Sequence, residues 1–163
     1  MMHMKRLLSI FVPSFGFSSS SASSRLKIGD ILKQARTFSN ADVVEYSKLS
    51  CDSNPLHFDS DCARNAGFGD RLVHGMLVAS LFPRIIASHY PGAVYVSQSL
   101  QFRLPVHIGE DITGVVQATN IREIKKKYIV KFSTKCFKND DQLVLDGEAT
   151  AILPTLEPGE SMG

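Results

Sequence analysis

The chain has 163 residues, 44% of them hydrophobic, and a formal net charge of +2 at pH 7. This length accommodates one globular domain with a sizeable core and leaves little room for a second. A net charge this small excludes an argument from overall charge for binding to nucleic acid or to a membrane surface, so we expect no nucleic-acid partner and no membrane insertion.

The first 25 residues have the composition of a targeting segment. Residues 1–25 contain three basic residues, no acidic residue and a serine run over 18–24. An apolar patch over 7–12 is much shorter than the roughly 20 residues that span a bilayer, and the composition favours a transit peptide over a secretory signal. We therefore expect 1–25 to be a mitochondrial presequence, with a plastid address second and a disordered tail as the simplest alternative.

The three cysteines indicate a reducing compartment and give no metal-binding motif. Cys51, Cys62 and Cys136 are odd in number, and they form neither close pairs nor the even set of a disulfide framework. Cys62 and Cys136 are expected as small buried hydrophobic residues. Cys51 is a separate case because it lies beside a polar loop that carries two titratable residues.

Residues 26–163 are expected to form a single domain that begins with one strand and two helices. The sequence predicts a strand over 31–38. Ser39 and Asp42 have the spacing of a capping box, which predicts the start of a helix. Asp59 is placed to cap a second, short helix that stops at Gly67.

The most apolar stretch, 74–87, predicts a buried helix. Two series of apolar residues recur at i, i+4 and i+8, which gives this helix a wide apolar face. Pro83 removes an amide donor and clashes with the preceding turn, so we expect a kink or a local break. The two series are Leu77, Leu81, Ile85 and Val78, Phe82, Ile86.

From residue 94 onward the apolar period changes to two. Strands are predicted over 94–103, 111–121, 128–138 and 142–153, and short links, including a hairpin turn at Asn139-Asp140-Asp141, predict an antiparallel meander. The expected fold class is α+β, a curved antiparallel sheet wrapped around a long central helix. Because such a sheet leaves edges to cover, we also expect a homodimer.

A polar loop between the first two predicted helices combines residues suited to proton transfer. Asp52 and His57 lie five positions apart, on either side of Asn54-Pro55. One of the two side chains can hold a water or a hydroxyl while the other moves a proton. Pro55 restricts the backbone and Asn54 can bond nearby amides. From chemistry alone, the pair fits either an acid–base site or an ordinary surface loop.

A resemblance to a known family covers nearly everything after residue 26. Tyr46-x-x-Leu-Ser-Cys-Asp-x-Asn-Pro-Leu-His57, followed after five residues by Ala63, resembles the signature of the MaoC-like (R)-specific enoyl-thioester hydratases, which have the hot-dog fold. Within this family, the chain is most similar to plant mitochondrial 3-hydroxyacyl-[acyl-carrier-protein] dehydratases. The resemblance continues through 72–77, 98–106, 109–110 and 147–149, and the closer similarity rests on 1–25, 95–100 and 128–137.

The resemblance implies a hydro-lyase that needs no cofactor and no metal. The implied reaction is the reversible removal of water from a (3R)-3-hydroxyacyl thioester of acyl-carrier protein, in fatty acid synthesis of the mitochondrial matrix. An (R)-specific enoyl-CoA hydratase of beta-oxidation, acting on a coenzyme A thioester, is the nearest alternative. A hot-dog acyl thioesterase and a non-catalytic acyl-binding module are further alternatives.

The resemblance also implies roles for individual residues. Asp52 and His57 would share the proton transfers at C2 and at the C3 oxygen. The backbone N–H of Gly75, at the start of the predicted long helix, would stabilise the charge that builds on the thioester oxygen. A glycine there can also serve only close packing of the helix on the sheet. Three supporting residues are expected beside them: Asn54, Pro55 and His74.

Two positions depart from the family pattern. Cys51 stands where the family usually has glycine, and Pro83 lies near a position where some hydratases carry a serine that supports the acidic residue. Neither departure removes a residue of the expected site. A nucleophilic Cys51 is a minor alternative, because nothing except its proximity to His57 points to an activated thiolate.

A basic run comprises Arg122 and the lysines at 125–127. Such a run is ordinarily a solvated turn. The functional alternative is that it docks an acidic acyl-carrier protein or the phosphates of coenzyme A.

Overall fold

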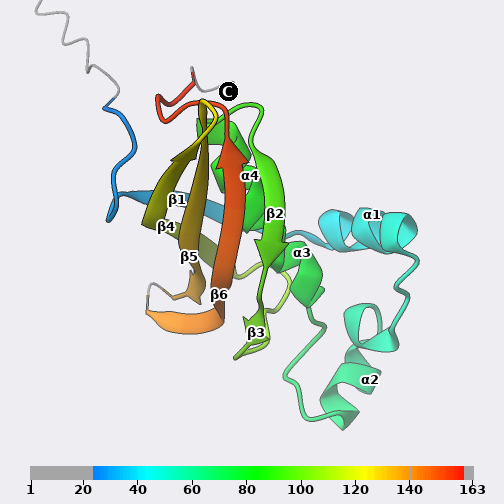
Figure 1. Cartoon of the computed structure of the whole chain (residues 1–163). Helices are drawn as coiled ribbons and strands as arrows, with labels where there is room; N and C mark the ends of the chain where they lie inside the picture. Colours follow the sequence, from blue (N-terminus) through cyan, green and yellow to red (C-terminus); the bar gives the residue numbers. More distant parts are fainter. Residues whose placement is uncertain (1–23, 140, 160–163) are drawn as a thin grey trace, which may run out of the picture.

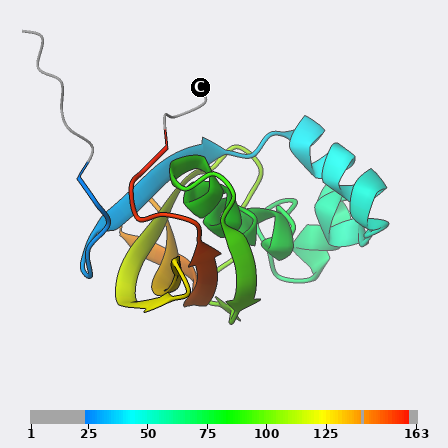
Figure 2. The same cartoon turned by 45° about the horizontal axis from the view of Figure 1, so that its top comes forward.

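The computed structural model describes residues 24–139 and 141–159, so the presequence expected over 1–25 falls almost entirely outside the described residues. A six-stranded antiparallel sheet curves around helix α4 (Leu81–His89), which lies in its concave side (Figure 1, Figure 2). Helices α1 (Asn40–Ser50) and α2 (Ser60–Asn65) lie together beyond one side of this sheet. Within the described part, no helix is long and apolar enough to cross a membrane.

The strand order is β1-β4-β5-β6-β2, with the short β3 paired to β6. Strands β4, β5 and β6 form the predicted meander, but β2 lies beside β6 instead of β4, so the prediction of four successive neighbours is wrong for its first strand. The eight-residue connection over 103–110 lets the chain cross from one side of the sheet to the other. The strands are β1 (Ile31–Thr37), β2 (Val94–Gln98), β3 (Gln101–Phe102), β4 (Asp111–Ile124), β5 (Lys127–Lys138) and β6 (Gln142–Leu153).

The strand predicted over 94–103 is interrupted between β2 and β3. The Gln98 side chain turns back and donates from Nε2 to the Ser99 carbonyl and to the buried Thr134 hydroxyl, 2.6 and 3.0 Å away. The register of β2 on β6 also shifts between Tyr95 and Ser97. At the other end of β6, the pairing of Lys138 with Gln142 confirms a chain reversal over 139–141, although Asp140 itself lies outside the described residues.

The predicted long helix consists of two segments. Helix α3 (Gly75–Ala79) is followed by Ser80, which is both the C-cap of α3 and the N-cap of α4. The break predicted from Pro83 is therefore confirmed, and it lies one turn ahead of the proline. Proline offers no N–H to the carbonyl four residues earlier, that of Ala79, and its ring clashes with that carbonyl, so the helix bends there.

The core lies between α4 and the concave side of the sheet. Val130, Phe132 and Cys136 of β5 are at most 1% exposed, whereas Lys131 and Lys135 between them are exposed, which confirms the predicted alternation. Burial raises the pKa of the Cys136 thiol to about 12, so this cysteine behaves as a small apolar residue. Helix α4 presents its own buried residues to this side: Leu81, Phe82, Ile85 and Ile86.

The capping box predicted at the start of α1 is present. Ser39 Oγ accepts from the Asp42 amide at 3.2 Å, and Asp42 accepts from the Ser39 amide at 2.8 Å. The hydrogen bond from the Ser39 amide is the largest of the contacts that lower the pKa of Asp42. The Asp59 side chain likewise accepts from the first amides of α2, as predicted. Helix α1 thus has a fixed start, and its other end delivers the chain to the polar loop.

Candidate active site

The polar loop begins where α1 ends, at a residue with left-handed backbone. Cys51 has φ 58° and ψ 19° and forms the C-cap of α1. After Asp52 and Ser53, the Asn54 side chain accepts from the Leu56 amide at 3.1 Å and caps a single 3₁₀ turn, η1 (Pro55–His57). Proline at the first position of this turn loses no hydrogen bond. The sequence features of the loop therefore act on its backbone, as expected for scaffold residues.

Asp52 and His57 face one another across this turn. Asp52 Oδ1 accepts from the Asn54 amide at 3.2 Å, while Oδ2 lies 4.0 Å from His57 Nε2. The Asp52 side chain is 50% exposed and that of His57 only 11%. One partner therefore reaches solvent while the other lies at the base of the site.

The tautomer of the neutral His57 ring follows from the hydrogen bond at one of its nitrogens. His57 Nδ1 lies 2.8 Å from the backbone oxygen of Leu72. A carbonyl oxygen only accepts, so Nδ1 carries the hydrogen in the neutral ring and Nε2 keeps its lone pair. Nε2 lies 4.0 Å from Asp52 Oδ2, beyond hydrogen-bond distance, so its lone pair is available to act as a base.

His74 packs directly on His57. The two rings are stacked with centroids 3.6 Å apart and planes inclined by 25°. His74 Nε2 donates to the Asp52 carbonyl at 3.2 Å, which ties the residue before α3 to the polar loop. Burial lowers the pKa of His74, and the neighbouring His57 lowers it further, against the opposing effect of the Asp52 carbonyl. His74 thus holds backbone in place and stays neutral at physiological pH.

Gly75 is the first residue of α3, immediately after His74. Its N–H is one of the amides that a helix start leaves without an intrahelical acceptor. Within residues 24–139 and 141–159 it has no hydrogen-bond acceptor. A Cβ atom at this position would lie 2.6 Å from Cε1 of Phe102. An added side chain would have to displace the Phe102 ring, which is 57% exposed, and its absence leaves the amide open to approach.

These residues line one wall of a cavity of about 520 Å³. Its polar end holds Asp52 and His57, and Arg103 lies at its side, paired with Asp146 at 2.9 Å. A second cavity of about 300 Å³ runs along α3 and α4 and shares Tyr46 and Met76 with the first. The rest of the large cavity is mostly apolar, with Phe68, Leu72, Val73, Val78, Phe102, Leu104, Val106, Val144 and Leu145 among its lining residues.

Asp52, His57 and His74 bring possible metal ligands within 4.8 Å of one another. Their geometry suits proton transfer better. The two imidazole rings are stacked, so their in-plane lone pairs do not converge on one point. His57 Nδ1 and His74 Nε2 already bind backbone carbonyls. Asp52 Oδ2 and His57 Nε2 lie 4.0 Å apart, and His74 Nδ1 is buried without a hydrogen-bond partner among the described residues.

The basic run at 122–127 lies far from this cavity within one protomer. Lys125 and Lys126 form the turn between β4 and β5, at the opposite end of the sheet from β3 (Figure 1). Residues 145 and 153 of β6 mark the two ends, and eight residues of strand span roughly 25 Å. The run therefore lies roughly 25 Å from the cavity lining at Leu145 in the same protomer.

Two contributors to the site carry no clear sequence signal. The Leu72 carbonyl that orients His57 is a backbone group, so any residue type at that position supplies it. Phe102, which closes over Gly75, belongs to the short β3 strand. Both lie in segments that resemble the family, but neither residue type nor spacing predicts the role of either position.

Solved structures of hydratases share this fold. The (R)-hydratase from A. caviae involved in PHA biosynthesis superposes with a TM-score of 0.74 at 37% identity, covering 79% of this chain and 98% of that chain. R-Hydratase PhaJ1 from Pseudomonas aeruginosa gives a TM-score of 0.72 at 30% identity, covering 80% of this chain and 83% of that chain. The fold and the polar loop together define a hydro-lyase of the hot-dog fold.

The chain belongs to the MaoC-like domain family, whose model matches residues 25–137. It is 67% identical over 156 residues to the mitochondrial 3-hydroxyacyl-[acyl-carrier-protein] dehydratase FERN of Solanum lycopersicum, covering 95% of this chain and 93% of that protein. The mitochondrial 3-hydroxyacyl-[acyl-carrier-protein] dehydratase of Arabidopsis thaliana is 63% identical over 142 residues, 86% of each chain. The (R)-specific enoyl-CoA hydratase of Aeromonas caviae is 38% identical, covering 79% of this chain and 96% of that protein. These relatives confirm the family and the enzyme class expected from the sequence, and a mitochondrial location.

Proposed function

We propose that this enzyme catalyses the reversible dehydration of (3R)-3-hydroxyacyl-acyl-carrier-protein to trans-2-enoyl-acyl-carrier-protein in the mitochondrial matrix. The observation that carries the proposal is the pair formed by Asp52 Oδ2 and His57 Nε2, 4.0 Å apart at the polar end of a largely apolar cavity. Acyl-carrier protein is preferred to coenzyme A because the two plant dehydratases are 67% and 63% identical, against 38% for the bacterial enoyl-CoA hydratase.

Asp52 and His57 act as one proton-transferring unit in this proposal. The unit takes the C2 proton, the electrons of the C2–H bond form the C2–C3 double bond, and the C3–O bond breaks. The departing oxygen takes a proton from the same unit and leaves as water, so the side chains end each turnover with the protons they began with. Both groups lie on one side of the cavity, which supports syn elimination.

The N–H of Gly75 donates a hydrogen bond to the thioester oxygen and stabilises the negative charge that builds there. Loss of the C2 proton moves electron density onto that oxygen, and a donor fixed at this place stabilises it. The His74 side chain supports this role because its bond to the Asp52 carbonyl ties the start of α3 to the proton-transferring loop. The site therefore brings together a base and an oxyanion donor that come from separate segments of the chain.

The apolar part of the large cavity suits the acyl chain. The second cavity shares Tyr46 and Met76 with the first and lies along the two helical segments. Burying methylene groups against such walls contributes about 0.8 kcal/mol for each group. We propose that Met76, which is 56% exposed at the junction, controls how far an acyl chain extends.

Purified enzyme given matched (3R)-3-hydroxyacyl thioesters on both carriers tests the proposal. We expect release of water from the acyl-carrier-protein substrate with kcat/KM well above that for the coenzyme A ester. A preference for the coenzyme A ester would favour the hydratase of beta-oxidation. Release of free thiol from a saturated acyl thioester would identify a thioesterase. Acyl binding without either reaction would identify a non-catalytic module.

We further propose a homodimer that forms along β2. This strand is an edge of the sheet, and Val94 and Val96 on it are 57% and 56% exposed, an arrangement that pairing with a second copy would cover. Val96→Lys should give a monomer in light scattering. Ile31→Lys is the matched control, since Ile31 is 50% exposed on the opposite edge strand, β1. A dimer that survives Val96→Lys would overturn this interface.

Residues 1–25 are proposed as a mitochondrial presequence and 26–163 as the mature domain. Leu26 supports this boundary because its side chain is only 3% exposed and its amide donates to the Leu156 carbonyl at 2.9 Å. Fusing 1–25 to a fluorescent protein should direct that protein to mitochondria. A fusion that stays in the cytosol or enters plastids would contradict the assignment.

A further inference from the structure

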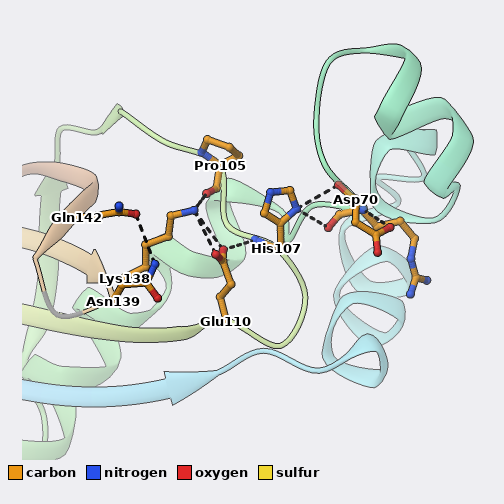
Figure 3. A network of polar contacts seen from close by, with 8 residues as sticks. Asp70, Pro105, His107, Glu110, Lys138, Asn139 and Gln142 are labelled. Atoms are coloured by element: carbon orange, nitrogen blue, oxygen red, sulfur yellow. Dashed lines mark hydrogen bonds and ion pairs between the residues drawn. The ribbon is translucent and has the colours of Figure 1, made fainter.

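Lys138 lies on the buried face of β5, where the alternation of the strand predicts an apolar residue. It follows Cys136 on the inward side of β5, and its side chain is only 10% exposed. Its Nζ donates to the Pro105 carbonyl at 2.8 Å and lies 3.3 Å from both carboxylate oxygens of Glu110 (Figure 3). Burying an ammonium group is unfavourable unless it is paired. The hydrogen bonds and the ion pair of Nζ therefore account for a lysine at this position.

The pair formed by Lys138 and Glu110 holds one loop segment at two points. Lys138 binds the carbonyl of Pro105, and Glu110 Oε2 accepts from the amide of His107 at 2.7 Å. The His107 ring continues the network, with Nδ1 3.1 Å from the Asp70 carbonyl (Figure 3). The segment 105–107 is thereby fixed from the end of β5 on one side and against residue 70 on the other.

The same segment is the backbone partner of the residues that build the site. The Val73 amide donates to the Val106 carbonyl at 2.8 Å, and Leu72 forms an isolated antiparallel bridge with His107. The Leu72 carbonyl is the group that accepts from His57 Nδ1. Val73 also leads directly into the residues that open α3. The position of segment 105–107 therefore sets the position of the carbonyl that orients the His57 ring.

We propose that Lys138 and Glu110 are positioning residues for catalysis, acting through segment 105–107 and the Leu72 carbonyl to hold His57 in its Nδ1-protonated tautomer. This role rests on the proposed function of His57. Neither side chain touches the substrate cavity, so their effect reaches the chemistry only through the backbone. A displacement of about 1 Å at a reacting group can lower a rate about a hundredfold, which gives such a pair a measurable effect.

The test combines the tautomer of His57 with steady-state kinetics. Lys138→Met keeps the aliphatic stem and removes the three donors. We expect kcat to fall about tenfold or more with KM changed less than about twofold, and the NMR signals of the His57 ring nitrogens to show mixed tautomers. Lys135→Met is the matched control, because Lys135 lies on the exposed side of the same strand. It should leave both readouts unchanged.

The NMR readout separates this proposal from the proposed function, because it needs no turnover. A folded Lys138→Met protein that keeps a single Nδ1-protonated His57 and at least half of kcat overturns the positioning role. Glu110→Gln is the second variant, nearly isosteric and still able to accept from the His107 amide. It should give a smaller loss, and combining it with Lys138→Met should add little because the two residues act as one unit. Losses that multiply in the double variant would also overturn the proposal.

Discussion

His57 Nε2 faces Asp52 Oδ2 across 4.0 Å while Nδ1 of the same ring is held 2.8 Å from the Leu72 carbonyl. These two distances link the ring to two segments of the chain. The loop after α1 supplies both side chains, and the segment before α3 supplies the carbonyl. A neutral histidine that donates from one ring nitrogen offers the lone pair of the other nitrogen to the substrate. Proton transfer at this site therefore depends on both segments.

Removing either member of the pair should abolish most of the activity. Asp52→Asn and His57→Ala should each lower kcat for hydration of a trans-2-enoyl thioester by about 10²- to 10⁴-fold, because each removes a group that transfers protons. Asp61→Asn is the matched control, since its carboxyl is 86% exposed on α2. Near-normal rates in folded Asp52→Asn or His57→Ala protein would contradict the assigned roles.

Gly75→Ala should destabilise the protein through a contact with one ring. The added Cβ would lie 2.6 Å from Cε1 of Phe102, which is 57% exposed, so we expect a cost near the low end of the about 1–3 kcal/mol typical of overpacked cores. Urea unfolding measures the loss. The double variant Gly75→Ala/Phe102→Ala should recover part of it, because the clash is then absent.

Gly69→Ala is the control for the Gly75 experiment. A Cβ at Gly69 meets nothing within 4 Å, and its φ is not positive, so the free energy of unfolding should change little. If Gly75→Ala were as harmless as Gly69→Ala, the packing requirement would be wrong. The remaining reason for glycine would be the open approach of a substrate to the Gly75 N–H.

The polar loop shows how far residue types and spacing predict local structure. The Ser39–Asp42 capping box and the Asn54-Pro55 turn were both predictable, since caps and turns depend on neighbouring residues. Asp52 and His57 could be singled out by their chemistry, and the family resemblance distinguished them from an ordinary surface loop. Their mutual distance also depends on Leu72 and His74, which come from another segment.

Long-range pairing was less predictable. The alternation of β5 predicts a strand with one buried face, but it contains nothing that places β2 beside β6. Lys138 illustrates the same limit: residue type favours the surface, whereas its partners Glu110 and the Pro105 carbonyl come from a distant loop. Such contacts arise from tertiary packing, which overrides local preference.

His74 should make stability depend on pH. Burial holds its pKa below the ordinary value of 6.5, so the unfolded chain binds the proton more readily than the folded protein. The stability that His74 contributes is fully present above the unfolded pKa of 6.5. It is lost as the pH falls from 6.5 toward the pKa of the folded protein. His74→Gln should therefore narrow the difference in unfolding free energy between about pH 7.5 and about pH 5.5. A difference equal to that of the wild type would contradict this effect.

Cys51→Gly should stabilise the protein and leave catalysis intact. The residue has φ 58° at the C-cap of α1, a conformation that is unfavourable for a side chain and open to glycine. Relief of this strain should raise the free energy of unfolding by about 0.5–1 kcal/mol in urea titrations. The same variant tests the minor alternative of a nucleophilic thiol, because glycine removes the sulfur. A large loss of kcat in a protein as stable as the wild type would establish that the Cys51 thiol takes part in the reaction.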